Sequence, residues 1–329
     1  MKCFSRKVIL FLVLSFCVAS GVYAEEIRVI PVGRAVGVRI YTDGLLVVGT
    51  SEVNGENVAK KSGIKVNDCI KEINGEYIDS SEEFAQIVNS NPDGVTLSVT
   101  RDNQNIEINA VPVLSEDNVY RLGLWVRDST AGIGTVTYFD PASGTFAALG
   151  HSINDVDTGN ILSVKSGNIL NCDILSVTKS AKGSPGEING AFDGEKIGDL
   201  EINSQVGIFG KMTGSEFADI GGAIPVAAKE QIHEGDAYII SDALGDENNQ
   251  YSVKIDKITN DAEKSLVIEI TDQRLIEGCG GIVQGMSGSP IIQDGRLVGA
   301  VTHVFVNNPL KGYGALAENM IDMSSKIAD

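Results

Sequence analysis

From residue 35 onward, short apolar stretches alternate with polar turn residues along most of the chain. Val95–Arg101 alternates apolar and polar positions, which is typical of a strand with one buried face. Asn67-Asp68 and Asn74-Gly75 mark breaks where residues that favour turns are clustered. Because no long helical period is evident over 115–310, the pattern predicts a mostly β protein.

One stretch in the first third has the signals of a helix instead. Ser80–Glu83 combines a serine N-cap with acidic residues in the first helical turn. Apolar residues then recur at helical spacing, at Phe84, Ile87 and Val88. We therefore predict a short amphipathic helix at this point in the chain.

The segment Asn57–Gly75 reads NVAKKSGIKVNDCIKEING. It resembles the PDZ family, in which a short helix ending in Ala-Gly-Ile leads to a Gly-Asp turn and then to a strand and an Asn-Gly turn. Asn67-Asp68 stands here in place of Gly-Asp. The resemblance implies a PDZ domain, which we assign to 35–114, with 25–34 as a lead-in and a domain boundary near 115.

PDZ domains bind peptide ends by adding a strand to an open sheet edge. By resemblance, the edge would be the loop and strand Gly44, Leu45, Leu46 and Val47. The helix that bears Phe84 and Ile87 would form the second wall of this groove for a peptide or protein terminus. The alternative is that Leu46 and Ile87 are only core residues, since their spacing also fits ordinary amphipathicity.

Length, composition and charge narrow the classes of protein that fit. A chain of 329 residues is expected to form two domains. Hydrophobic residues make up 43% and aromatic residues 6%, with 37 glycines, which indicates a turn-rich globular protein. The formal net charge is −18, and no basic cluster follows the N-terminus. This argues against a nucleic-acid partner, because phosphate binding needs Lys and Arg patches.

Residues 1–24 have the three parts of an export signal. Basic residues occupy the start, Val8–Ala19 is apolar, and Val22–Ala24 resembles a small-residue cleavage site. The apolar run is shorter than the roughly 20 residues of a membrane span. We predict export across the cytoplasmic membrane with cleavage after Ala24, and an uncleaved N-terminal anchor is the alternative.

The five cysteines do not indicate a disulfide framework. Two lie in the export segment, and Cys69, Cys172 and Cys279 are an odd number at no metal-like spacing. We expect these three to be buried as small apolar side chains. No metal or organic cofactor is implied.

The stretch Gly285–Pro290 reads GMSGSP and resembles the segment that displays a nucleophilic serine in chymotrypsin-like β-barrels. Gly285 lets the backbone turn so that its own N–H and that of Ser287 can point at one spot, an oxyanion hole. Pro290 would start the following strand, where a missing N–H costs little. The alternative is an ordinary Gly/Ser turn between two strands.

A serine nucleophile needs a base within hydrogen-bond reach, and the chain has three histidines. We favour His151, which ends a small-residue apolar strand and opens into a polar loop, where functional side chains tend to lie. His303 follows Ser287 on the next apolar strand and is the second candidate, or else a core histidine. His233 lies in what we expect to be an exposed turn and is the third.

Leu149–Thr158 and Gly280–Pro290 together resemble the sporulation stage IV B (SpoIVB) serine peptidase family, in which a PDZ domain precedes the peptidase. The resemblance covers essentially the whole chain after the export segment. It implies a chymotrypsin-like double β-barrel over 115–329. It assigns the nucleophile to Ser287 and the base to His151.

The third catalytic residue has three candidates. The family resemblance points to Asp272, while Asp155 and Asp157 lie nearer to His151 in sequence. An orienting carboxylate fixes the tautomer of the base and stabilises its charged form. The alternative for Asp155 and Asp157 is a turn that hydrogen-bonds its own backbone. We also expect the strand at Thr302, His303 and Val304 to lie beside the substrate backbone.

The resemblance implies a secreted serine endopeptidase that acts between the two membranes around a developing spore. It implies cleavage of a regulator of an intramembrane protease, in a sporulation signalling checkpoint, and self-cleavage near the N-terminal side. Two alternatives remain: a PDZ adaptor with an inactive barrel, and an exported quality-control protease. In the latter class the PDZ domain usually follows the barrel, whereas here it comes first.

Overall fold

The computed structural model describes residues 26–328 except for 103, 215, 218–219 and 246–248. The export signal expected over 1–24 lies outside the described residues. In the described part strands predominate and helices are short, as the hydrophobic pattern predicts. None of these helices is long and apolar enough to cross a membrane.

Six strands close into a first barrel because β2 pairs with β9 as well as with β11. Around the barrel they are β2 (Ala35–Thr50), β9 (Leu124–Asp140), β10 (Thr145–Ala148), β13 (Gly207–Met212), β12 (Glu187–Ser204) and β11 (Val164–Thr178). The short β1 (Arg28–Pro31) joins β9 on one side and β14 (Ile224–Pro225) on the other. Buried apolar side chains such as Val38, Phe146 and Ile169 fill the interior, and their removal from water stabilises the closed sheet.

A second closed barrel follows in the chain. Its strands, in spatial order, are β15 (Gly235–Ser241), β16 (Asn249–Ile258), β17 (Leu266–Ile270), β20 (Asn308–Leu316), β19 (Arg296–Phe305) and β18 (Pro290–Gln293). The 3-10 turn η1 (Lys229–Gln231) precedes it, and the helix α4 (Gln273–Cys279) links β17 to the loop before β18. The structure therefore has the chymotrypsin-like double barrel that the sequence resemblance implies.

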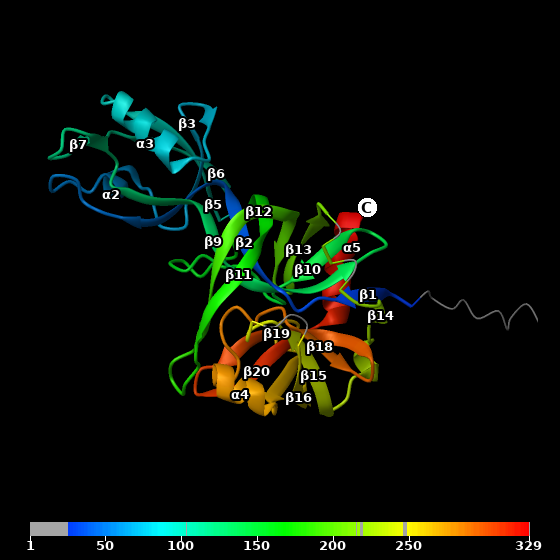
Figure 1. Cartoon of the computed structure of the whole chain (residues 1–329). Helices are drawn as coiled ribbons and strands as arrows, with labels where there is room; N and C mark the ends of the chain where they lie inside the picture. Colours follow the sequence, from blue (N-terminus) through cyan, green and yellow to red (C-terminus); the bar gives the residue numbers. More distant parts are fainter. Residues whose placement is uncertain (1–25, 103, 215, 218–219, 246–248, 329) are drawn as a thin grey trace, which may run out of the picture.

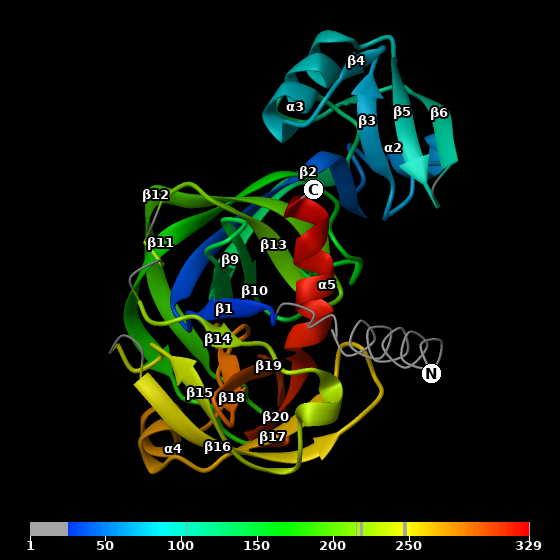
Figure 2. The same ribbon diagram turned by 90° about the vertical axis from the view of Figure 1, so that its right-hand side faces the viewer.

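The last helix, α5 (Ala317–Ala328), lies along both barrels, which are stacked one above the other (Figure 1 and Figure 2). Its buried side chains Met320 and Ile327 share one apolar cluster with residues of both barrels. Tyr138 of the first barrel is fully buried and donates a hydrogen bond from its hydroxyl to Ser324 Oγ at 3.0 Å. The helix thus helps to hold the two barrels together.

A smaller α+β unit projects from the first barrel, at the upper left of Figure 1. It contains α2 (Val58–Ser62), β3 (Cys69–Ile73), β4 (Glu76–Tyr77), α3 (Ser81–Ser90), β5 (Val95–Arg101), β6 (Gln104–Ala110), β7 (Val113–Leu114) and β8 (Tyr120–Arg121). It has its own apolar core, separate from those of the barrels. The predicted helix is confirmed as α3, which Ser80 caps by accepting a hydrogen bond from Glu83 N.

Two residues explain the departure from the Gly-Asp pattern in this unit. Asn67 has a φ of +76°, a left-handed conformation that glycine and asparagine adopt most readily. Asp68 is fully buried, accepts a hydrogen bond from Lys65 N, and forms a two-point ion pair with Arg101. The turn therefore keeps its backbone geometry without the glycine.

The structure divides the chain differently from the expected boundaries. Ala35–Tyr41, which we assigned to the PDZ domain, pairs with Ser129–Thr135 and with β11 inside the first barrel. Only the later part of β2, from Leu45, belongs to the small unit, and Leu124–Arg127 of β9 pairs with it there. The PDZ-like unit is thus an insertion between two barrel strands, and the chain does not change domain near 115. Local sequence pattern misses this because each half of β2 alternates as an ordinary strand would.

Candidate catalytic cleft and peptide groove

Ser287 lies on the loop between α4 and β18, and two glycines shape this loop. Gly285 and Gly288 have φ values of +98° and +102°, which side-chain-bearing residues rarely adopt. A Cβ on Gly288 would lie 1.9 Å from the carbonyl oxygen of Thr135 on β9. The loop can therefore approach the first barrel only because glycine stands at 288.

The backbone of this loop presents two amide groups that are not in use. Among the described residues, neither the N–H of Gly285 nor that of Ser287 donates to a protein acceptor. Two such donors beside a nucleophile can hold a developing oxyanion. Both amides are therefore available for the role predicted for them from the sequence.

His151 follows β10 through two residues in left-handed conformation, Leu149 with φ +68° and Gly150 with φ +70°. This turn directs the partly buried imidazole toward the second barrel. A Cβ on Gly150 would lie 2.9 Å from Cγ2 of Thr302 on β19, so the histidine loop packs closely against that strand. The His151 Nδ1 atom lies 2.8 Å from the Ser152 carbonyl oxygen, which favours the tautomer protonated at Nδ1 and leaves Nε2 as the basic nitrogen.

The structure brings His151, Ser287, Thr302, His303 and Val304 together as lining of one cavity of about 490 Å³ between the barrels. The His151 and His303 rings are 4.5 Å apart between centroids. The Ser287 hydroxyl donates to the Thr302 carbonyl at 2.6 Å rather than to His151. Proton transfer to His151 therefore requires the serine side chain to turn, and such hydrogen bonds often form only once substrate is bound.

The cleft lowers the basicity of both histidines. Burial lowers the pKa of His151 below its ordinary value of 6.5, and the Ser152 carbonyl and Glu263 partly oppose this. Desolvation, together with the charges of His151 and Lys264, lowers the pKa of His303 to about 4. Both rings are therefore neutral at pH 7, the state that a general base needs.

Asp272 lies in another part of the second barrel and does not approach His151. Its carboxylate caps α4 through Arg274 N and forms an ion pair with the Arg274 guanidinium. It lines a separate surface hollow with Tyr238, Gln250 and others, none of which lines the histidine–serine cleft. An aspartate after a strand and before a helix is a good N-cap, and here that role accounts for its position.

The two rival carboxylates also have structural partners. Asp155 is buried, and its Oδ1 accepts hydrogen bonds from Asp157 N and Thr158 N, so it closes a turn on its own backbone. Both Asp155 and Asp157 form ion pairs with Arg127 of β9. None of the described carboxylates accepts a hydrogen bond from His151. The hydrogen-bond partner of its ring is the Ser152 carbonyl.

His233 is exposed and lies outside the cleft. Its Nε2 atom is 2.9 Å from Asp294 Oδ2, and hydrogen bonds to Glu234 O and this carboxylate raise the pKa of His233. It faces the turn between β18 and β19 and has no contact with Ser287. His233 therefore lies in an exposed loop, as we expected from the sequence.

The expected peptide-binding strand needs correction. Gly44–Val47 lies between two neighbours, because Leu45 and Leu46 pair with β3 while Leu46 and Val47 pair with β9. Leu45 and Val47 are fully buried, and Ile87 packs against the same core. A peptide cannot add a strand where both edges are already paired, so these residues belong to the core of the unit.

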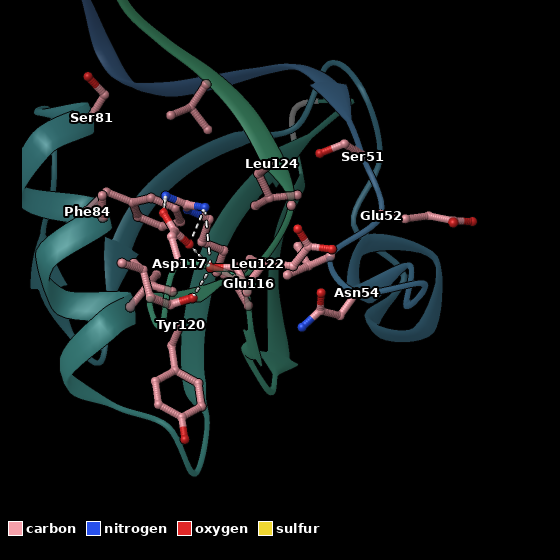
Figure 3. Close-up of a pocket in the computed structure, with 18 of the residues that line it drawn as sticks. Ser51, Glu52, Asn54, Ser81, Phe84, Glu116, Asp117, Tyr120, Leu122 and Leu124 are labelled. Carbon is pink, nitrogen blue, oxygen red and sulfur yellow. Dashed lines mark hydrogen bonds and ion pairs between the residues drawn. The ribbon is translucent and has the colours of Figure 1, made fainter.

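A groove does exist on this unit, between α3 and the start of β9 (Figure 3). Phe84, Ala85 and Val88 of α3 line one wall, and Leu122–Leu124 and Val126 line the other. From Leu124 to Arg127 the β9 backbone pairs only with β2, so within the described residues its other edge is open. Of the residues expected to bind the peptide, Phe84 lines this groove.

Two positions that contact the serine loop or line the groove were not predicted from the sequence. Thr135 hydrogen-bonds to the serine loop from β9, and Leu124 stands at the open edge of the groove. The stretch Leu122-Gly123-Leu124 carries a Gly-Leu signal as strong as Gly44-Leu45, with Gly123 at φ +65°. That second Gly-Leu could have been weighed against the first, whereas nothing local marks Thr135.

No group of three or more metal-ligating side chains occurs among the described residues that could hold an ion. Cys69 and Cys172 are partly buried, and Cys279 is buried. Burial raises the pKa of the Cys279 thiol to about 11, so it is inert as a nucleophile at pH 7.

Comparison with solved structures finds protease and PDZ chains. The protease Rv3671c from M. tuberculosis in its active form is 14% identical, with 61% of this chain and 75% of that chain covered and a TM-score of 0.34. The HtrA-type protease AlgW with a decapeptide is 13% identical, covering 61% and 54%, with a TM-score of 0.35. The PDZ domain of an SdrC-like protein from Listeria innocua is 24% identical, covering 26% and 94%, with a TM-score of 0.23.

No match is found among curated proteins. The family model described as SpoIVB peptidase S55 matches residues 118–321, which is more than half of the chain. That span includes β9, the histidine loop and the serine loop. The chain is a serine peptidase and belongs to the SpoIVB peptidase family.

Proposed function

We propose that this chain is a regulatory endopeptidase that cleaves peptide bonds with Ser287 as nucleophile and His151 as general base. The observation that carries the proposal is the shared cleft, which His151, Ser287 and Gly285 line together, while the N–H groups of Gly285 and Ser287 have no acceptor among the described residues. His151 Nε2 takes the serine proton as Ser287 attacks the substrate carbonyl. The amides of Gly285 and Ser287 hold the oxyanion, and His151 then protonates the leaving amine.

The lining of the cleft supports an apolar substrate. None of the described side chains that line it is an aspartate, glutamate, lysine or arginine. Val156 is 83% exposed and Val306 50% exposed at its margins, although both are apolar. Contact with apolar substrate side chains would remove this surface from water, whereas a charged side chain would lose hydration without gaining a partner.

The wider role is proposed from the family and the domain order. We propose that the substrate is a membrane-associated regulator of an intramembrane protease, cleaved in a sporulation signalling checkpoint after export, in the space between the forespore membranes. We also propose self-cleavage near the N-terminal side. The groove between α3 and β9 would bind a peptide or protein terminus by strand addition.

The test compares wild type with Ser287→Ala, both expressed without residues 1–24. We expect wild type to react with a fluorophosphonate probe and to cut itself on the N-terminal side of the barrels. Ser287→Ala should do neither. A matched serine variant in a nearby buried position, Ser289→Ala, should still react, because Ser289 lies outside the cleft lining.

The main competing function is that of a PDZ adaptor with an inactive barrel. Folded wild type that fails to react with the probe, and that binds peptides at the groove, would establish that reading. Equal self-cleavage by wild type and Ser287→Ala would mean that another protease is responsible. General degradation of casein would instead favour a quality-control protease.

A further inference from the structure

Thr135 on β9 contacts both chain segments that bear the proposed catalytic groups. Its N–H donates to the Ser287 carbonyl at 2.8 Å, and its hydroxyl donates to the Gly285 carbonyl at 2.7 Å. Its own carbonyl accepts a hydrogen bond from Leu149 N at 3.1 Å, two positions before His151. The residue is fully buried, although threonine is polar. One side chain of the first barrel is thus bonded to the serine loop of the second.

The hydrogen bonds of the serine loop show what this contact does. Four successive carbonyls, from 284 to 287, each accept a hydrogen bond. Gln284 accepts from Ile188 N at 2.8 Å and Met286 from Ser289 N at 2.9 Å. The other two carbonyls, of Gly285 and Ser287, are both held by Thr135. No other residue contributes twice to this set.

Peptide planarity links these carbonyls to the oxyanion donors. In a trans peptide the N–H points opposite to the carbonyl of the same plane. Fixing the carbonyl of residue 284 therefore aims the Gly285 N–H, and fixing that of residue 286 aims the Ser287 N–H. The plane between them carries the Gly285 carbonyl. The N–H of this middle plane, from Met286, donates to the Val283 carbonyl at 3.2 Å, and the Thr135 hydroxyl is its second and shorter anchor. Gly285 has no side chain and a φ of +98°, so without that second anchor the plane is freer to shift.

We propose that Thr135 is a positioning residue whose hydroxyl holds the oxyanion hole in its working geometry. The inference rests on the proposed role of Ser287 as nucleophile. Thr135 does not line the cleft and needs no contact with substrate. Without its hydroxyl, the Gly285 carbonyl would lie buried and unpaired, and a shift of this peptide plane would relieve that cost. The plane shares the Cα atoms of residues 285 and 286 with the two donor planes, so such a shift would displace both amides.

The chain offers a matched pair of variants for a test. Thr135→Val keeps the shape of the side chain and removes the hydroxyl, while Thr135→Ser keeps the hydroxyl. Thr137 lies on the same strand, is also fully buried, and its hydroxyl has no hydrogen-bond partner among the described residues. Thr137→Val therefore controls for changing a buried threonine at this barrel.

We expect Thr135→Val to lower kcat about 10- to 100-fold on a peptide substrate, since small misplacements in an active site have effects of this size. KM should change less than about twofold, because the ground-state carbonyl makes little use of the hole. Thr135→Ser should keep most of kcat, and Thr137→Val should match wild type. A peptide aldehyde, which forms a tetrahedral adduct with the serine, should lose affinity for Thr135→Val in proportion to kcat.

Wild-type kcat and aldehyde affinity in Thr135→Val would overturn the inference, as would an equal loss in Thr137→Val. If Thr135→Val does not fold, Thr135→Cys replaces it and is compared with Thr135→Ser, because cysteine is a much weaker donor. Activity retained in Ser287→Ala would refute the proposed function instead. The two failures are therefore distinguishable.

Discussion

At the scale of single residues, the environment of His151 sets the pH range of the enzyme. The imidazole must be neutral to accept the serine proton, and burial lowers the pKa of His151 below 6.5. We therefore predict that kcat/KM rises with pH along an acidic limb whose midpoint lies below pH 6.5. A pH profile from 4 to 9 measures this, and an acidic limb centred above pH 7 would contradict it. In His303→Gln the midpoint of the acidic limb should stay within about half a pH unit of the wild-type midpoint, since the pKa of His303 is about 4.

Gly288 shows how a single missing side chain positions the loop that bears Ser287, the proposed nucleophile. Its backbone needs a left-handed φ, and a Cβ would meet the Thr135 carbonyl oxygen at 1.9 Å. We predict that Gly288→Ala reduces fluorophosphonate labelling at least 100-fold, in line with a displacement of about 1 Å. Gly295 has a φ of +74° but open space around it. Gly295→Ala thus introduces backbone strain without a steric clash, and this variant should react with the probe as wild type does. An equal loss of labelling in both glycine variants would show that backbone strain is the cause.

Asp272 caps α4 and pairs with Arg274, and its lowered pKa predicts how these contacts respond to pH. Hydrogen bonding to Arg274 lowers the pKa of Asp272 to about 2, from an ordinary 3.8. A carboxylate with a lowered folded-state pKa stabilises the protein above about pH 4, and this stabilisation is lost as the pH falls toward 2. Asp272→Asn should weaken that pH dependence and cost about 1 kcal/mol of stability at pH 7, because the ion pair with Arg274 is lost.

Thermal or urea unfolding at pH 2 to 7 measures this change, and kcat is measured beside it. We expect kcat per folded molecule to stay at the wild-type level, since Asp272 lies outside the cleft. Loss of kcat with unchanged stability would instead place the Asp272 carboxylate at His151.

At the scale of elements, the peptide groove depends on one face of α3. Ala85 is exposed and lines the groove, whereas the next residue, Gln86, is exposed and does not. We predict that Ala85→Arg weakens binding at least tenfold for a peptide selected by display on the Ser287→Ala protein, because its side chain would fill the groove. Gln86→Arg adds the same charge beside it and should bind normally. Loss of binding in both would indicate a charge effect only.

Element type was predictable where the signals are local. The serine cap and helical spacing predicted α3, and the turn at Asn67-Asp68 forms with the dihedral angles that its residues favour. Element length was not predictable in the same way. Asp43-Gly44 looks like the end of a strand, yet β2 continues through it with a register shift between Tyr41 and Leu46. Pairing with β9 on both sides of the shift, which no local pattern encodes, holds the strand together.

At the scale of the whole molecule, the insertion of the PDZ-like unit makes it removable. Tyr41 and Ser129 are Cα partners on adjacent antiparallel strands, so the chain can be closed there by a tight hairpin. We predict that replacing residues 43–127 with Asn-Gly leaves both barrels folded and Ser287 reactive toward the fluorophosphonate probe. Peptide binding at the groove should be lost.

Circular dichroism, unfolding cooperativity and probe labelling measure this outcome. The same deletion with Ser287→Ala gives the background of labelling. A folded but unreactive deletion chain would show that the inserted unit supports the catalytic cleft, through the β2 and β9 strands that run into both.

The sequence by itself determined the chemistry and the class of fold. The glycine-flanked serine, a histidine after a strand and the turn-rich apolar pattern all depend on residues close together in the chain, so they can be read locally. Only the tertiary structure decided which side chains meet. In it β2 pairs with β9, and the peptide groove lies beside Leu124. Asp272 pairs with Arg274, and Thr135 hydrogen-bonds to the serine loop. Those contacts join segments far apart in sequence, and their geometry follows from barrel closure rather than from any local preference.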